Sequence, residues 1–124
     1  MATISNITTG EQTVSATGAI TGTLDTSGLS GDYTVKLRVS GLSAGKKIMI
    51  ALEDTANASA FSDALQCAVF HVVGGATADG NYNERKNYDI PMTRFGAANT
   101  KLRFNTLAID SSPGTVLVYG WLEQ

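Results

Sequence analysis

Apolar and polar residues alternate with a period of two along much of the chain, which is the pattern of strands with one buried side and one wet side. The clearest run is residues 33–40, where every second residue from Tyr33 to Val39 is apolar and the residues between them are polar. The same alternation, over fewer residues, occupies 47–53 and 101–106. These three segments are therefore predicted to be strands that each place one face against a hydrophobic core.

Two further segments are apolar on both faces. Residues 65–73 carry apolar side chains at both sets of alternate positions, so we predict a central strand that is covered on two sides. In residues 115–123 one side consists of Val116, Val118, Gly120 and Leu122, and the other of Leu117, Tyr119 and Trp121. The second of these sides is a large apolar face that needs a partner.

Shorter strand candidates and turn residues fill the rest of the chain. The shorter candidates are Thr3–Thr8, Glu11–Ala16, Ile20–Asp25 and Asn83–Ile90. Gly41–Gly45 is interpreted as the turn of a hairpin, and Ala58–Leu65 as a short helix or a loop. Strands spaced by about 8–14 residues with such turns indicate an antiparallel sandwich or barrel. We predict one all-β domain over residues 1–124, an antiparallel β-sandwich of about eight strands that is jelly-roll-like.

Charge and residue counts exclude several classes of function. Nine Lys and Arg residues stand against eleven Asp and Glu residues, a formal net charge of -2, which argues against a nucleic-acid partner. The single Cys67 excludes an intrachain disulfide framework and a Cys-rich zinc site, and the single His71 excludes any site with two histidine ligands. No cofactor or metal is therefore predicted.

The beginning of the chain, MATISNITTG, has no basic start and no long apolar run, so no secretory signal is expected. No stretch approaches the roughly 20 apolar residues that cross a bilayer. We expect a soluble chain that is made in the cytoplasm and has no membrane partner.

Two serine motifs overlap in one glycine-rich segment. Gly41–Gly45 matches G-x-S-x-G, which activates a serine only on a sharp strand-to-helix turn with a histidine nearby. Ser43 also begins an S-x-x-K match with Lys46, without the companion motifs of the β-lactamases. Because a strand follows this segment, both matches are interpreted as a turn between strands.

Two acidic motifs also lack residues that their chemistry requires. Asp25–Gly28 resembles the loop of aspartic proteases, but Ser27 stands where the glycine belongs. Asp79–Asn83 offers oxygen ligands at alternating positions, as a calcium loop does, but Glu84 and Ile90 replace the required glycine and glutamate. They are interpreted as a strand end with a turn and as a polar loop.

Cys67 and His71 lie on the same face of the predicted strand 65–73. A nucleophilic Cys–His pair needs a cleft and a third group that orients the histidine. We predict instead a packed histidine and a small inert cysteine. No catalytic residue, and no enzymatic activity, is expected.

The sequence contains candidate surfaces for binding another protein. Tyr82 and Tyr88 flank the basic pair Arg85-Lys86, and exposed aromatic residues near arginine are favoured at protein interfaces. The segment Ala2–Ile7 is predicted to add a strand to a neighbouring molecule, because nothing near it fixes its register. The candidate interface residues are Ile4, Ile7, Tyr82, Arg85, Tyr88 and Trp121.

Taken as a whole, the chain resembles the small decoration (cement) proteins of tailed-bacteriophage capsids. The resemblance covers most of the chain and is carried by the polar start Met1–Gly10, a Gly/Thr/Ser-rich all-β body, a hairpin and a chain-terminal strand. The hairpin is Tyr33–Asp54, YTVKLRVSGLSAGKKIMIALED, and the terminal strand is Thr115–Gln124, TVLVYGWLEQ.

This resemblance implies a jelly roll or a related β-sandwich that forms dimers or trimers and has no catalytic residues. It also implies a virion structural protein on the capsid surface, which binds the major capsid protein and stabilises contacts between capsid subunits. The alternative is a carbohydrate- or ligand-binding β-sandwich module with Tyr82, Tyr88 or Trp121 as a stacking platform.

Overall fold

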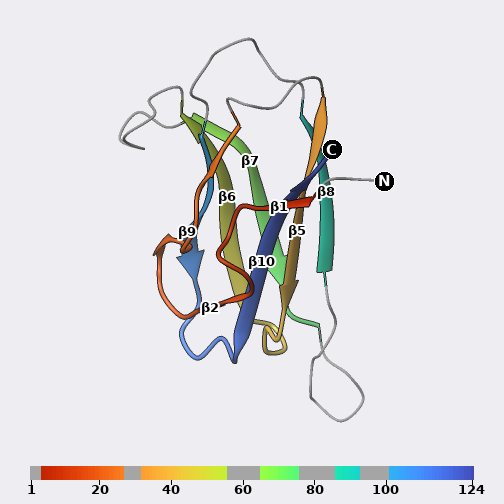
Figure 1. The fold of residues 1–124 in the computed structure, drawn as a ribbon. Coiled ribbons are helices and arrows are strands. Elements are labelled where there is room, and N and C mark those ends of the chain that lie inside the picture. Colours follow the sequence, from red (N-terminus) through yellow and green to blue (C-terminus); the bar gives the residue numbers. More distant parts are fainter. Residues whose placement is uncertain (1–3, 27–31, 56–64, 76–85, 93–100) are drawn as a thin grey trace.

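The structure, a computed structural model, describes residues 4–26, 32–55, 65–75, 86–92 and 101–124. These residues contain ten strands and no helix, and every strand pair is antiparallel. The strands form two five-stranded sheets that pack against each other (Figure 1). The predicted all-β sandwich is therefore confirmed.

Sheet I contains β1 (Ile4–Asn6), β2 (Gln12–Val14), β5 (Tyr33–Ser40), β8 (Lys86–Met92) and β10 (Val116–Glu123). Sheet II contains β3 (Gly18–Ala19), β4 (Leu24–Asp25), β6 (Lys47–Thr55), β7 (Leu65–Val73) and β9 (Lys101–Ile109). β1 and β2 pair with opposite ends of β10, and β3 and β4 pair with successive parts of β9. β1 and β2 together occupy the position of one interrupted edge strand, and so do β3 and β4. Counted in this way, each sheet has four strand positions, which we call rows.

The order of the rows is that of a jelly roll. Sheet I runs β1/β2, β10, β5, β8, and sheet II runs β3/β4, β9, β6, β7. Successive rows along the chain therefore lie in alternate sheets, except for the neighbours β6 and β7. This arrangement is the pair of Greek keys that defines a jelly roll. Eight rows also account for the expected strand number, because two of the rows are broken in two.

The core lies between the sheets and follows the predicted alternation. In β5 the apolar residues from Tyr33 to Val39 are buried and the polar residues between them are half-buried on the outer face. The side chains that are fully buried are Phe104, Ile7, Leu37, Leu42, Ile48, Ile50, Leu52, Leu102, Leu122, Val35, Val39 and Val116. Gly120 makes room for the largest of them, because a Cβ atom there would lie 2.2 Å from Phe104 Cε2.

The segment Gly41–Gly45 is not the turn of a hairpin. β5 belongs to sheet I and β6 to sheet II, so the segment crosses from one sheet to the other. The Ser43 amide donates to the Pro113 carbonyl (2.8 Å), and the Lys46 amide donates to the Ser43 carbonyl (3.0 Å). A strand follows rather than a helix, so Ser43 does not occupy the strand-to-helix turn that a hydrolase nucleophile needs.

The prediction of a central, doubly covered strand at 65–73 is wrong. Within the part of the chain that the structure describes, β7 pairs only with β6 and is an edge of sheet II. Ala68, Phe70 and Val72 pack on the core side. His71 lies on the outer face and is exposed, so it is not the packed histidine that the sequence indicated.

The N-terminal segment has a fixed register within its own molecule. β1 pairs with β10 through Ile4 opposite Glu123 and Asn6 opposite Trp121. The amides of Ile7 and Thr8 both donate to the Gly120 carbonyl, at 2.9 and 3.0 Å. The prediction that nothing fixes its register is therefore wrong, because β10 supplies a complete partner. The predicted helix or loop at Ala58–Leu65 falls outside the described residues, apart from Leu65, which begins β7.

Candidate functional site

The six candidate interface residues do not form one surface. Ile4 is 59% exposed, whereas Ile7 is 1% exposed and lies in the core. Tyr88 packs from the inner side of β8 against Phe70, with ring centroids 4.9 Å apart. Trp121 is half-buried on the outer face of sheet I, and Tyr82 and Arg85 lie outside the described residues. Ile4 and Trp121 are thus the two of these side chains that the structure places on the outer face.

An aromatic pair with a cation beside it occupies the outer face of sheet I. Tyr119 and Trp121 stack with ring centroids 4.7 Å apart and an interplanar angle of 18°. The Arg38 guanidinium lies 5.2 Å from the Tyr119 ring centroid and 5.9 Å from that of Trp121, within the range of a cation–π contact. The apolar side of the last strand therefore finds its partner in its own sheet, on β5.

Polar contacts tie this aromatic pair to neighbouring strands. The Tyr119 hydroxyl donates to Asn6 Oδ1 (2.5 Å), and the Trp121 indole donates to Glu123 Oε1 (3.0 Å). The indole hydrogen bond, together with the charge of Lys36, holds the pKa of the Glu123 carboxyl below its usual value. Lys36 lies 3.5 Å from Glu123 and 3.6 Å from Asp89, so with Asn6 the network extends across four strands, β1, β10, β5 and β8. The polar and charged side chains of this network therefore use most of their hydrogen-bonding and charge interactions on one another.

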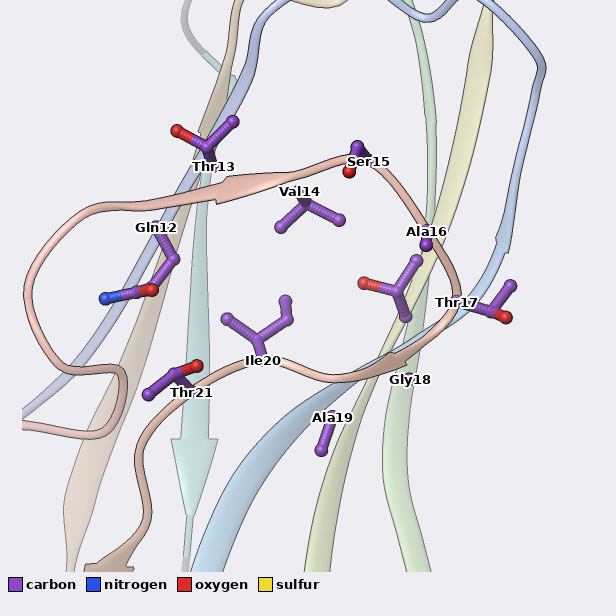
Figure 2. Close-up of a pocket in the computed structure, with 11 residues that line it drawn as sticks. Gln12, Thr13, Val14, Ser15, Ala16, Thr17, Gly18, Ala19, Ile20 and Thr21 are labelled. Atoms are coloured by element: carbon purple, nitrogen blue, oxygen red, sulfur yellow. The ribbon is translucent and has the colours of Figure 1, made fainter.

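A polar hollow of about 240 Å³ lies within the loop that joins β2 to β3. It is lined by Gln12–Thr21 and by Thr106 of β9, whose buried hydroxyl has no hydrogen-bond partner among the described residues. Figure 2 shows Val14 and Ile20 facing each other between the two arms of this loop. Both side chains are buried and belong to the hydrophobic core, so the floor of the hollow is part of that core. Its lining offers hydroxyl, amide and backbone groups, but no side chain that ionises near neutral pH.

A second hollow, of about 480 Å³, lies where β6, β7 and β9 meet. Its lining is mostly apolar and includes Met49, Val73 and Ala108, with Lys47, His71 and Asp110 as the polar members. The Lys47 amide donates to Asp110 Oδ2 (2.9 Å), and the Asp110 amide donates to the Lys47 carbonyl (3.0 Å). The Asp110 carboxylate is therefore used to close the end of the β6–β9 ladder.

Two acidic residues at the end of β6 differ in their surroundings. Glu53 is buried on the outer face and accepts hydrogen bonds from Arg103 Nε (2.7 Å) and Asn105 Nδ2 (3.1 Å). Asp54, the next residue, has a buried Oδ1 atom without a hydrogen-bond partner among the described residues, and burial raises the pKa of its carboxyl. Sequence patterns could not reveal the Glu53–Arg103 pair, because its members lie 50 positions apart.

The outer face of sheet II presents exposed apolar side chains that the sequence analysis had placed in the interior. Val69 and Val73 of β7 are 38% and 49% exposed, and with Ile4 they are the exposed large hydrophobic residues of the described chain. This edge and the hollow beside it can bind another polypeptide by apolar contact and backbone hydrogen bonds. Within the described ranges no group of three His, Cys, Asp or Glu side chains is placed to hold a metal ion.

No family model matches the chain, and a search of curated proteins finds no relative. No helix among the described residues is long and apolar enough to cross a bilayer.

Proposed function

We propose that this chain is a non-enzymatic virion protein that binds the outside of a phage capsid, as an oligomer, and stabilises contacts between capsid subunits. The observation that carries the proposal is a jelly-roll frame with one long edge, β7, whose exposed valines and lack of charged residues favour association between copies and leave the outer face of sheet I for the capsid. The partner is the major capsid protein. The choice of a capsid as the binding partner rests on the resemblance of the sequence to decoration proteins.

The physical basis of this role is the addition of contacts between capsid subunits. A protein that binds two neighbouring subunits stabilises the assembled shell, because its binding energy must be lost before the subunits separate. Repetition over a lattice multiplies a modest contact many times. A frame of paired strands loses little conformational entropy on docking, which favours such repeated binding. The extensive strand pairing of both sheets suits the chain to this task.

The proposal is tested by sedimentation with expanded capsids of the phage whose genome encodes the chain. We expect the purified chain to pellet with the capsids and to saturate at a fixed number of copies per capsid. The chain alone, under the same conditions, serves as the control and should stay in the supernatant. A chain that remains soluble beside capsids at tens of micromolar would contradict the proposal.

The stacked pair Tyr119–Trp121 is the observation that favours a second candidate, a carbohydrate-binding module. Sugars stack on the faces of aromatic rings, and here each ring already covers one face of the other. A sugar could therefore contact only the ring faces that are not stacked against each other. For this reason the carbohydrate-binding module is the second candidate. Binding on a glycan array that disappears in Trp121→Ala would support it over capsid binding.

A further inference from the structure

The sheet edges of this molecule differ in how well they are protected. An edge strand presents unpaired backbone groups, and proteins protect it by keeping it short or by placing charges and proline on it. β1, β2, β3 and β4 have two or three residues each. The sequence of β8, KNYDIPM, contains Lys86, Asp89 and Pro91. Among the strands that the structure describes, three of the four sheet edges therefore carry a protective feature.

The fourth edge, β7, differs from the others. It is nine residues long, and its sequence, LQCAVFHVV, contains no charged residue and no proline. Val69, His71 and Val73 are exposed on its outer face. Of the three exposed large hydrophobic residues among the described residues, two lie on this strand. Such a strand is a template for pairing with another extended strand.

We propose that β7 pairs edge to edge and antiparallel with β7 of a second copy of this chain, about a twofold axis at His71. The inference rests on the proposed function and deepens it, because it names the surface through which the protein associates with itself.

The register follows from an irregularity in the β6–β7 pair. Leu52 lies opposite Ala68 and Glu53 lies opposite Gln66, so Cys67 is an additional residue at a bulge. A bulge interrupts regular pairing, which leaves the part of β7 after Cys67, up to Val73, for a new partner. Within that part, His71 lies midway between the two exposed valines, Val69 and Val73.

A twofold axis at His71 makes the strand complementary to itself. Val69 then lies opposite Val73 of the second copy, and Val73 lies opposite Val69 of the second copy. Each exposed valine then has a valine of the second copy beside it on the same face, and no like charges meet, because the strand contains no Lys, Arg, Asp or Glu. The two imidazole rings lie beside each other at the axis, on the exposed outer face of the strand. Because the paired stretch is short, we expect a reversible dimer.

The first test measures mass by light scattering over a range of concentrations. The wild-type mass should rise from 13.0 kDa toward twice that value, whereas Val73→Lys should associate at least tenfold more weakly. Ile4→Lys changes the matching exposed residue on the other sheet and should associate as the wild type does. A wild type that stays at 13.0 kDa, or a Val73→Lys variant that dimerises normally, would overturn the inference.

The second test locates the axis and does not depend on the stability of the lysine variants. In a Cys67→Ser background, His71→Cys places one thiol beside that of the second copy, so a short bis-maleimide should yield a covalent dimer. Thr17→Cys, an exposed position in the loop between β2 and β3, is the control and should stay monomeric. Equal cross-linking of the two variants would overturn the inference. If the chain still pellets with capsids in that case, the proposed function stands without this interface.

Discussion

At the scale of single residues, neighbouring positions in one strand have opposite electrostatic roles. Glu53 is a buried acid whose two oxygens accept hydrogen bonds from Arg103 and Asn105. Asp54 has one oxygen buried without such a partner among the described residues. Removing one partner from a buried ion pair leaves an uncompensated charge, whereas removing an unpartnered charge relieves a cost. The two acids should therefore respond to substitution in opposite directions.

Asp54→Asn should stabilise the fold at neutral pH and not in acid. Burial raises the pKa of the Asp54 carboxyl in the folded state above its ordinary value of 3.8, so ionisation at pH 7 costs folding free energy. This cost is absent below the ordinary pKa, where the carboxyl is protonated in both the folded and the unfolded chain. The gain in unfolding free energy should be a few tenths of a kcal/mol at pH 7, since solvent screens a partly exposed group, and should vanish near pH 3. Urea unfolding at both pH values measures it.

Asp32 is exposed, and Asp32→Asn serves as the control, with unfolding free energy unchanged at either pH. An Asp54→Asn variant that is less stable than the wild type at pH 7 would show that the carboxylate is stabilising, against this account.

At the scale of elements, the N-terminal segment is an integral part of sheet I. Ile7 is 1% exposed, and its amide shares the Gly120 carbonyl with Thr8. The Gly120 amide in turn donates to Thr8 Oγ1 at 3.1 Å. A segment that was free to join a neighbouring molecule would leave this part of the core open.

Ile7→Ala should lower the unfolding free energy by about 2–5 kcal/mol, because it opens a cavity in the core. Ile4→Ala, at the exposed position three residues earlier, should change it by less than about 0.5 kcal/mol. Chemical denaturation of both variants provides the comparison. Equal losses would mean that the segment is not packed as described.

Alternation predicted the strands well where one face was polar. In β5 the polar residues Thr34 to Ser40 mark the outer face, so both the strand and its orientation followed from the sequence. In β7 both faces are apolar, and this pattern fits a covered central strand as well as an edge strand whose outer face exposes apolar side chains. Turn residues at Gly41–Gly45 likewise do not specify whether the next strand stays in the same sheet. These distinctions depend on contacts between distant segments, which periodicity does not report.

The candidate site was predicted less well for the same reason. Ile7 was expected at an interface because nothing near its segment fixed a register, and Tyr88 because it flanks Arg85-Lys86, yet both side chains pack into the core. Val69 and Val73 were expected in the interior and are exposed. Position in a sheet, rather than residue type, decides which apolar side chains remain available for binding.

At the scale of the whole molecule, the two outer faces differ in character. Sheet I carries aromatic and charged groups that are bound to one another, from Asn6 to Asp89. Sheet II carries exposed valines at a long unprotected edge. This asymmetry is the reason for which we propose self-association at the β7 edge and leave the outer face of sheet I for solvent or for the capsid.

The central claim, that the chain acts by strengthening contacts between capsid subunits, is tested most directly by heating capsids with and without it. The measurement is the temperature at which expanded capsids filled with DNA release that DNA, followed by a dye that cannot enter intact shells. The account predicts that saturating amounts of the chain raise this temperature by several degrees. An unchanged release temperature on capsids that carry the bound chain would contradict it.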